Sequence, residues 1–450
     1  MSNWAPPRAP GEWLARSDMT KATWGYEPGK VFLGSLPSDG SVAVARGDDR
    51  HIVTIAGSRA GKSSTALLPN LKLWPGSVLV IDPKGELARI AGEWRAAFGR
   101  VVVLDPFNVT GQRDTHGWNP FHELLSLRPD LIPDEAAAMA DALIVHDSGR
   151  DSHWVQAAQN LIRGLILFLL ASGKETANLA YLRRFIASGE ALMPILDRMA
   201  ECDAYGGVVA NLGASLRATN EREQAGIIST AATQTSFLDS PGLQSISARS
   251  TFTLADMASD TPISVFLVLP SSRIPTHYRW LRLFISMAMT AMELAPRPPQ
   301  TPVLWMLEEF AQLGHMRALQ SAAGYMAGYG VKLWMVLQDL PQLKTHYKDG
   351  WETFLGNAGV VQAFGNSDPS TLEYLSRRLG EIDLELVEQN PSNLDGMRRG
   401  DFGERRRIDR RPLLSPSEIE RSFAREAQNS LILAAGQKPL VVDRLHWERM

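Results

Sequence analysis

Short apolar runs alternate with amphipathic stretches along the first third of the chain. The apolar runs His51–Ala56, Ser77–Asp82 and Arg100–Asp105 are strand candidates, and helical patterns begin near Lys62 and Gly85. Nearly continuous apolar strands separated by helices are typical of a parallel sheet that is covered by helices on both faces. The pattern therefore predicts an α/β fold.

The strand pattern disappears from about residue 118 to about residue 240, where the sequence indicates helices interrupted by proline and glycine. It then resumes, with strand candidates over Ile263–Leu269, Pro302–Leu307, Val331–Leu337, Gly359–Phe364, Ser430–Ala434 and Leu440–Leu445. We expect a mostly parallel central sheet that is divided in sequence by an inserted all-α domain. The expected organisation is an extended N-terminal arm over 1–30, the first part of the sheet domain over 31–117, the insertion over 118–240 and the second part over 241–450.

A glycine-rich segment links the first predicted strand to a helix. Its residues are Gly57, Ser58, Arg59, Ala60, Gly61, Lys62, Ser63 and Ser64. In such a loop, backbone N–H groups bind phosphates, the lysine reaches the β and γ phosphates, and the following serine ligates Mg²⁺. We therefore expect this loop to bind ATP and Mg²⁺. The usual first glycine is replaced by Ala56, which is costly only if that position requires a positive φ.

A magnesium-nucleotide site also requires an acidic residue at the end of a neighbouring strand. The buried strand within Pro302–Ala311 ends in Glu308 and Glu309, and a competing candidate, Ser77–Glu86, contains Asp82. Successive side chains of a strand point in opposite directions. We therefore assign Glu308 to Mg²⁺ and Glu309 to catalysis.

The predicted strand Val331–Leu337 is followed by a polar amide, Gln338. At the carboxyl end of a strand beside a nucleotide, a glutamine can hydrogen-bond the γ-phosphate or orient water. The alternative is that Gln338 caps a helix. We expect Lys62, Glu309 and Gln338 to form the catalytic set.

The composition, with 44% hydrophobic and 21% charged residues, is that of a globular protein and excludes collagen-like, coiled-coil and wholly disordered chains. There are 46 Lys and Arg against 49 Asp and Glu, a net charge of −3, so a nucleic-acid partner would need a local basic surface. The single cysteine excludes an internal disulfide framework. The apolar runs Gly164–Ala171 and Ile263–Pro270 are shorter than the roughly 20 residues of a membrane span, so we expect a cytoplasmic protein. The arginine-rich stretch from Arg398 to Arg411 predicts a mobile surface loop.

Several motifs in order resemble the type IV secretion system coupling proteins, the TraG/TraD-like conjugative DNA-transfer ATPases. They are Leu73–Glu86, Val101–Phe107, Trp118–Pro120, Met306–Gly314, Leu337–Leu343, Asn366–Pro369 and Arg411–Glu418. The resemblance runs from about residue 30 to the C-terminus. It implies a RecA-like P-loop NTPase with an inserted all-α domain, which typically forms a homo-hexamer. It also implies ATP-driven recruitment and movement of single-stranded DNA, relaxase–DNA complexes or effector proteins toward a secretion channel, whose components are further partners.

Three departures from the family pattern limit what the resemblance implies, and the last two of them support an alternative function. Family members usually begin with transmembrane helices, and none is predicted here, so partners would recruit this chain to the inner membrane. The first Walker B acid is commonly Asp but is Glu308 here, which is expected to slow hydrolysis. The stretch Gly324–Lys332 lacks the arginine of some relatives, and Arg249 and Arg378 are the candidates to replace it. The alternative is a nucleotide-gated cargo receptor or assembly module with little or no hydrolysis.

Overall fold

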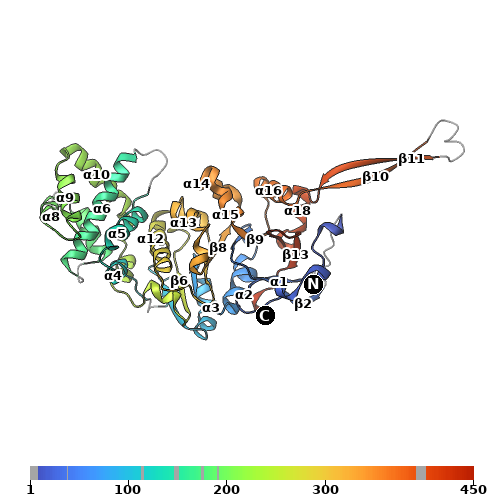
Figure 1. Cartoon of the computed structure of the whole chain (residues 1–450), viewed down its shortest axis with the longest axis horizontal. Helices are drawn as coiled ribbons and strands as arrows, with labels where there is room; N and C mark the ends of the chain where they lie inside the picture. Colours follow the sequence, from blue (N-terminus) through green and yellow to red (C-terminus); the bar gives the residue numbers. More distant parts are fainter. Residues whose placement is uncertain are drawn as a thin grey trace.

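The computed structural model describes residues 9–37, 39–112, 116–145, 152–173, 177–189, 192–391 and 402–450. The molecule is elongated, with a helical block at one end, an α/β body in the middle and a two-stranded hairpin that projects from the other end (Figure 1). The body contains an 11-stranded sheet in the order β2-β1-β13-β12-β9-β3-β8-β7-β4-β6-β5. Neighbouring strands are parallel from β5 to β9 and antiparallel from β9 to β2. The predicted α/β class with a mostly parallel sheet is confirmed.

Every strand predicted from the sequence is present. The sheet strands are β1 (Val31–Leu36), β2 (Asp39–Arg46), β3 (His51–Ala56), β4 (Val78–Ile81), β5 (Arg100–Leu104), β6 (Ile263–Leu267), β7 (Val303–Leu307), β8 (Val331–Leu337), β9 (Ala358–Phe364), β12 (Asn429–Ala434) and β13 (Leu440–Asp443). All residues of β3, β7, β8 and β9 are buried, as expected where helices cover both faces. The sequence pattern misses β1 and β2, in which glycine and serine interrupt the apolar runs at the antiparallel edge.

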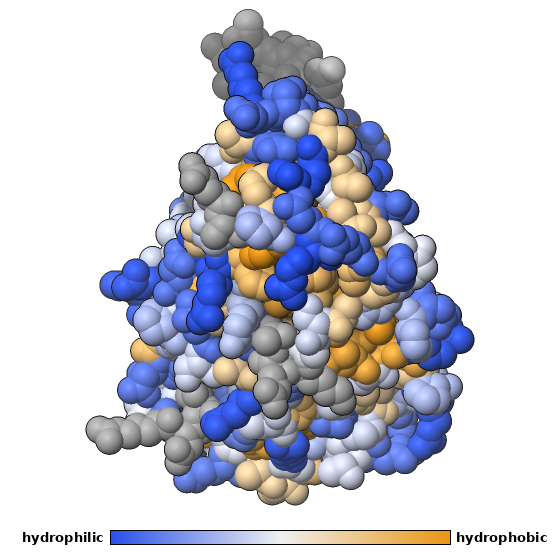
Figure 2. Space-filling view, turned by 90° about the vertical axis from the view of Figure 1, so that its left-hand side faces the viewer, coloured by the Kyte–Doolittle hydropathy of each residue, from blue (hydrophilic) through white to orange (hydrophobic). Residues whose placement is uncertain are grey.

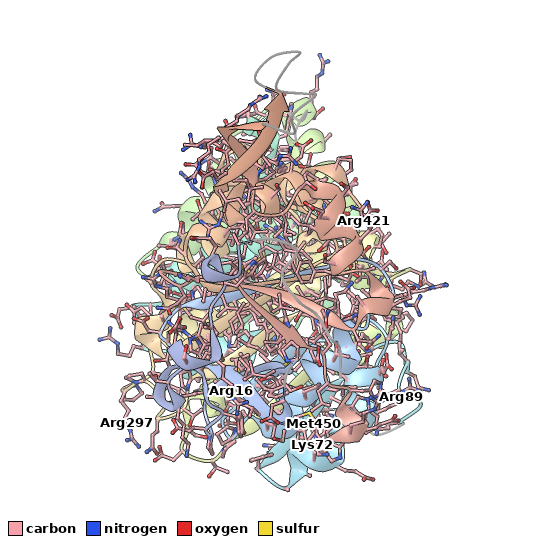
Figure 3. The ribbon with its side chains drawn as sticks, turned by 90° about the vertical axis from the view of Figure 1, so that its right-hand side faces the viewer. Arg16, Lys72, Arg89, Arg297, Arg421 and Met450 are labelled. Carbon is pink, nitrogen blue, oxygen red and sulfur yellow. The ribbon has the colours of Figure 1, made fainter. Side chains whose placement is uncertain are left out.

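Helices of the α/β body follow most of the parallel strands. Its helices are α1 (Lys21–Trp24), α2 (Leu68–Leu73), α3 (Glu86–Ala96), α12 (Ile274–Glu293), α13 (Arg317–Ala322), α14 (Leu340–Tyr347), α15 (Glu352–Gly356), α16 (Pro369–Leu379) and α18 (Pro416–Ser422). The C-terminus is tied to this body, because Lys72 at the end of α2 donates from Nζ to the Met450 carbonyl at 2.9 Å. Figure 3 shows these two residues side by side.

Between β5 and β6 the described residues form helices and contain no strand. These helices are α4 (Pro120–Ser126), α5 (Ile132–Leu143), α6 (Ser152–Ser172), α7 (Leu179–Ala187), α8 (Leu192–Ala200), α9 (Val208–Arg217), α10 (Glu221–Gln234) and α11 (Pro241–Ser247). Figure 2 looks onto this end of the molecule, where small apolar groups alternate with hydrophilic residues.

The central helix of this block, α6, is longer and more apolar than its sequence run suggested. By length and composition alone, His153–Ser172 is able to cross a membrane. However, 61% of the apolar window is buried inside the structure, where α6 packs against α5, α7, α9 and α10. The length of α6 is therefore explained by its role as the core helix of the block.

The arginine-rich segment differs from the predicted mobile loop. Residues 402–412 form β11 (Phe402–Pro412), which pairs with β10 (Glu381–Pro391) in an antiparallel hairpin. Arg398 and Arg399 lie outside the described residues. Across the hairpin, Arg406 pairs with Glu385 at 3.2 Å and Arg410 with Asp383 at 3.3 Å. The loop prediction is wrong for this strand, because alternating opposite charges pair across the two strands.

Candidate nucleotide-binding site

The glycine-rich loop leaves the carboxyl end of β3, which lies between β8 and β9. The left-handed positions in this loop are Arg59 (φ 58°) and Gly61 (φ 93°). A Cβ on Gly57 would lie 2.0 Å from the Gly365 carbonyl oxygen, so this position excludes any side chain. Ala56 is the buried last residue of β3 and has no positive φ. The alanine that departs from the usual motif therefore carries no backbone strain.

Lys62 folds back onto the loop from the start of the following helix. Its Nζ donates to the Ala56 carbonyl at 2.8 Å and to the Gly57 carbonyl at 3.2 Å. Burial lowers the pKa of Lys62 from its ordinary value, whereas Glu309 and Glu308 act to raise it. The lysine thus bridges the loop and lies near both carboxylates of the neighbouring strand end.

The strand end of β7 meets the loop at Ser63. The Ser63 hydroxyl lies 3.4 Å from Oε1 of Glu308, whose side chain is buried. Burial and, to a smaller extent, the nearby negative charge of Asp82 raise the pKa of Glu308 to about 7. Hydroxyl and carboxylate oxygens are the ligands that Mg²⁺ prefers, so this pair fits the ion.

Glu309 sits in a strained turn and is held by two amides. Its φ is 57°, in the left-handed region that non-glycine residues rarely adopt. Gln338 donates from Nε2 to Oε1 of Glu309 at 2.8 Å, and Gln312 donates from Nε2 to Oε2 at 3.1 Å. The helix-cap alternative for Gln338 is wrong, because Asp339 caps α14.

The competing acid, Asp82, forms a hydrogen bond that stabilises the start of a helix. Its Oδ2 accepts the backbone N–H of Ala88 at 2.9 Å and so caps the start of α3. Burial raises the pKa of Asp82 to about 6. Its strand, β4, lies beside β7, which explains its electrostatic effect on Glu308.

These groups line one pocket of about 500 Å³. The predicted loop residues from Ser58 to Ser64 all line it, together with Glu308, Glu309 and Gln338, whereas Gly57 lies behind them against Gly365. Sequence reasoning missed Ser271, which also lines the pocket and follows β6. Ligands bind at the carboxyl ends of parallel strands, and this rule could have predicted Ser271 as a lining residue.

Sequence reasoning also missed Arg444, which supports the loop from behind. Its Nη1 donates to the Ala60 carbonyl and its Nη2 to the Arg425 carbonyl, the latter at 2.7 Å. The guanidinium lies over the Phe364 ring, 4.6 Å from its centroid, and burial lowers its pKa to about 10. This contact joins segments that are far apart in the chain, so no local sequence motif predicts it.

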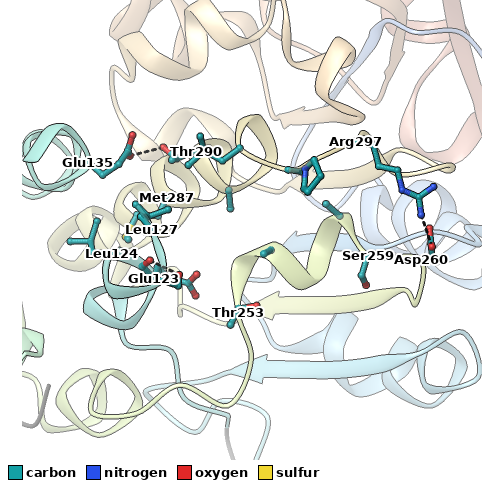
Figure 4. Close-up of a pocket in the computed structure, with 17 residues that line it drawn as sticks. Glu123, Leu124, Leu127, Glu135, Thr253, Ser259, Asp260, Met287, Thr290 and Arg297 are labelled. Atoms are coloured by element: carbon teal, nitrogen blue, oxygen red, sulfur yellow. Dashed lines mark hydrogen bonds and ion pairs between the residues drawn. The ribbon is translucent and has the colours of Figure 1, made fainter. Parts of the chain in front are cut away.

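A larger pocket, of about 620 Å³, lies away from this loop, between α4, α5 and α12 (Figure 4). Acidic residues line it, among them Glu123, Glu135 and Asp260. Arg297, the one arginine among the described residues that line it, is paired with Asp260 at 2.6 Å. Burial raises the pKa of Glu123 to about 7. This acidic surface is unsuited to phosphates.

The buried parallel strands, the glycine-rich loop after β3 and the acids after β7 define a RecA-like P-loop fold. The family described as "Type IV secretory system Conjugative DNA transfer" matches residues 12–450. The chain therefore belongs to this family, as the sequence motifs predicted.

Individual relatives support this assignment. Conjugal transfer protein TraG of Rhizobium radiobacter is 26% identical over 442 residues, which are 95% of this chain and 66% of that protein. Protein VirD4 of Agrobacterium fabrum (strain C58 / ATCC 33970) is 24% identical over 431 residues, covering 90% of this chain and 59% of VirD4. The chain thus spans less than two thirds of the length of these relatives.

Solved structures of the conjugative coupling protein TrwB share the fold. The unbound monoclinic form of TrwBΔN70 superposes with a TM-score of 0.67 and 18% identity, covering 88% of this chain and 85% of TrwBΔN70. TrwB in complex with ADP and Mg²⁺ gives a TM-score of 0.65, also at 18% identity and with the same coverage. At this identity the likeness establishes the RecA-like fold alone.

Proposed function

We propose that this chain is an ATP-driven coupling protein that recruits and moves single-stranded DNA, alone or with a bound relaxase or effector protein, toward a type IV secretion channel. One observation carries the proposal: the loop after β3 and the strand end of β7 meet in a single pocket, where Ser63 approaches Glu308 and Gln338 approaches Glu309. Family membership and the names of the relatives support the part of the proposal that concerns DNA transfer.

Each side chain in the pocket has a distinct role in this proposal. Lys62 would exchange its contacts with the loop carbonyls for the β and γ phosphates. Ser63 and Glu308 would hold Mg²⁺, which when bound neutralises charge on the phosphates. Glu309 would accept a proton from the attacking water.

Gln338 connects catalysis to nucleotide state. Its amide donates to Glu309 in this structure, and the same amide would be needed to contact a γ-phosphate. Binding of ATP would therefore draw Gln338 away and free one oxygen of Glu309 for water. Loss of the γ-phosphate would restore the hydrogen bond and shift the segment toward α14.

A homo-hexameric ring is part of the proposal, because its subunits would surround a DNA strand. Within it, the helical block over 118–240 is a candidate receptor surface for protein cargo. We place the ring in the cytoplasm, where channel components recruit it to the inner membrane.

ATP hydrolysis by the purified chain, measured with and without single-stranded DNA, tests the proposal. We expect DNA to stimulate hydrolysis and Lys62→Ala to reduce both rates by at least about 100-fold, because the phosphates lose their cationic partner. Lys72→Ala is the matched control, since Lys72 contacts the C-terminal carbonyl instead. Equal hydrolysis by wild type and Lys62→Ala would contradict the proposal.

A second function, a nucleotide-gated cargo receptor or assembly module, is favoured by one observation. At the metal site this chain has Glu308 in place of the shorter Asp that is common in the family, and its buried Oε1 lies 3.4 Å from the Ser63 hydroxyl. Tight ATP binding with negligible hydrolysis at every DNA concentration would support this function over the motor. Glu308→Asp would then be expected to raise the hydrolysis rate.

A further inference from the structure

A second polar pocket, of about 610 Å³, lies at the start of α12. Its walls come from the loop after β5, from η5 (Ser236–Asp239) and from the first turns of α12. Two arginines, Arg273 and Arg279, and two aromatic residues, Phe107 and Phe237, line it. The nucleotide mechanism uses none of these side chains.

The pocket is built for negative charge. No Asp or Glu is among the described residues that line it, and neither arginine forms an ion pair within the described part of the chain. The nearby Asp239 is already paired with Arg183 at 2.6 Å. The Arg279 guanidinium donates from Nη2 to Oε1 of Gln234 at 3.4 Å, whereas its Nε is buried without a hydrogen-bond partner among the described residues. The N-terminus of a 20-residue helix adds further positive potential.

Aromatic rings stand beside these cations. Phe107 has the Arg273 guanidinium 5.7 Å from its ring centroid and packs edge-on against His277 at 5.1 Å. Phe237 is buried, and its ring centroid lies 6.1 Å from that of His277. Cationic groups for the backbone and aromatic rings for the bases are the combination that binds single-stranded nucleic acid. A ligand that carried only phosphate groups would have no base to stack on an aromatic ring.

The same backbone segments also reach the nucleotide pocket. After β6, Ser271 lines the nucleotide pocket, and Arg273, two residues later, lines this one. On the opposite wall, Gly85 lies between two residues that line the nucleotide pocket, Lys84 and Glu86. Gly85 packs against Thr110 in the loop that carries Phe107. A change at the nucleotide therefore has a short path to both walls of this pocket.

We propose that this arginine–aromatic pocket is a binding site for single-stranded DNA, in which Arg273 and Arg279 contact phosphates and Phe107 stacks on a base. The inference rests on the proposed function, because it assigns that function's DNA to a place on the chain. The segment from Ser271 to Arg273 then transmits nucleotide state to the strand.

Fluorescence anisotropy with a labelled oligothymidylate tests this assignment on the full chain. We expect Arg273→Ala with Arg279→Ala to weaken binding at least tenfold. The slope of log affinity against log salt should also fall by about 0.7 for each phosphate that the variant no longer neutralises. Phe107→Ala is expected to weaken binding at least about fivefold, because one base then has no ring to stack on. Phe107→Trp keeps a stacking ring and should restore most of the affinity.

The matched control is Arg297→Ala, beyond the far end of α12, which should bind the oligonucleotide as wild type does. Circular dichroism establishes that each variant is folded. If wild type binds the oligonucleotide and the double arginine variant binds equally well, the pocket assignment is wrong and the proposed function stands. If Phe107→Ala binds as wild type does and inorganic polyphosphate competes equally for both, the pocket binds polyanions in general and its assignment to single-stranded DNA is wrong. Failure of wild type to bind any oligonucleotide, while it hydrolyses ATP, also overturns the assignment.

Discussion

The nucleotide pocket and the arginine–aromatic pocket lie on neighbouring segments but are built differently. The first is formed by one continuous loop and by the ends of parallel strands, and its lining includes acids, two lysines, an arginine and an amide. The second is assembled from helix starts and loops distant in sequence, with arginines and aromatic rings and no acid among the described lining residues. The comparison teaches that a pocket for chemistry requires opposite charges close together, whereas a pocket for a polyanion requires their separation.

The largest expected effect separates catalysis from DNA binding. Glu309→Gln removes the proposed proton acceptor, so hydrolysis should fall by about 10² to 10⁴. ATP affinity and oligonucleotide affinity should remain within threefold of wild type, because neither phosphate site changes. Glu373→Gln, on the exposed face of α16, is the control. Hydrolysis within tenfold of wild type, measured by phosphate release, would remove Glu309 from its role.

The next largest effect is on the pH dependence of stability, which the buried Glu308 side chain is expected to control. The pKa of Glu308 is raised to about 7 from its ordinary 4.5. Its contribution to the free energy of unfolding is therefore fully present below pH 4.5 and is lost as the pH rises through 7. Without nucleotide or Mg²⁺, Glu308→Gln should be more stable than wild type at pH 8, by up to about 3 kcal/mol. This difference should shrink toward pH 5. Urea unfolding at both pH values measures it, and a difference independent of pH would contradict the assignment.

A smaller effect concerns the γ-phosphate contact. Gln338→Ala removes one hydrogen bond to a charged group, so affinity for a non-hydrolysable ATP analogue should fall by about tenfold. Affinity for ADP should be unchanged, because ADP lacks the γ-phosphate. Calorimetric titration with both nucleotides checks this, and an equal loss for ADP would show that Gln338 acts on the pocket as a whole.

The smallest effect is expected at Ala56, the departure from the usual loop motif, and the neighbouring Gly57 provides a contrast with a large effect. Ala56→Gly should leave nucleotide affinity within twofold and reduce stability by about 0.5 to 1 kcal/mol, because glycine weakens a strand. Gly57→Ala should lower nucleotide affinity strongly, since its Cβ would meet the Gly365 carbonyl. The reverse pattern, measured by titration and thermal unfolding, would mean that Ala56 is the strained position.

Much of the fold and of the nucleotide pocket could be predicted from the sequence because the signals are local. Buried parallel strands such as β3 and β7 are continuous apolar runs, and the glycine-rich loop carries its function within eight residues. Gln338 directly follows an apolar strand, which is why the sequence predicts its position beside the glycine-rich loop.

The missed features depend on contacts between distant segments. Arg444 reaches Ala60 from the end of the last strand, and the arginine–aromatic pocket joins Phe107 to residues more than 120 positions away. The sequence pattern does not predict the hairpin of β10 and β11, because its strands are charged rather than apolar. In that hairpin, cross-strand pairs take the place of a buried face.

The most direct test is a structure of the chain with Mg²⁺ and a non-hydrolysable ATP analogue. We predict that the triphosphate lies along the loop from Ser58 to Ser63, with Mg²⁺ between Ser63 and Glu308 and with Lys62 on the phosphates. Gln338 should have left Glu309 for the γ-phosphate. A nucleotide bound elsewhere, with Lys62 still on the Ala56 carbonyl and the Glu308 side chain free of metal, would contradict the account.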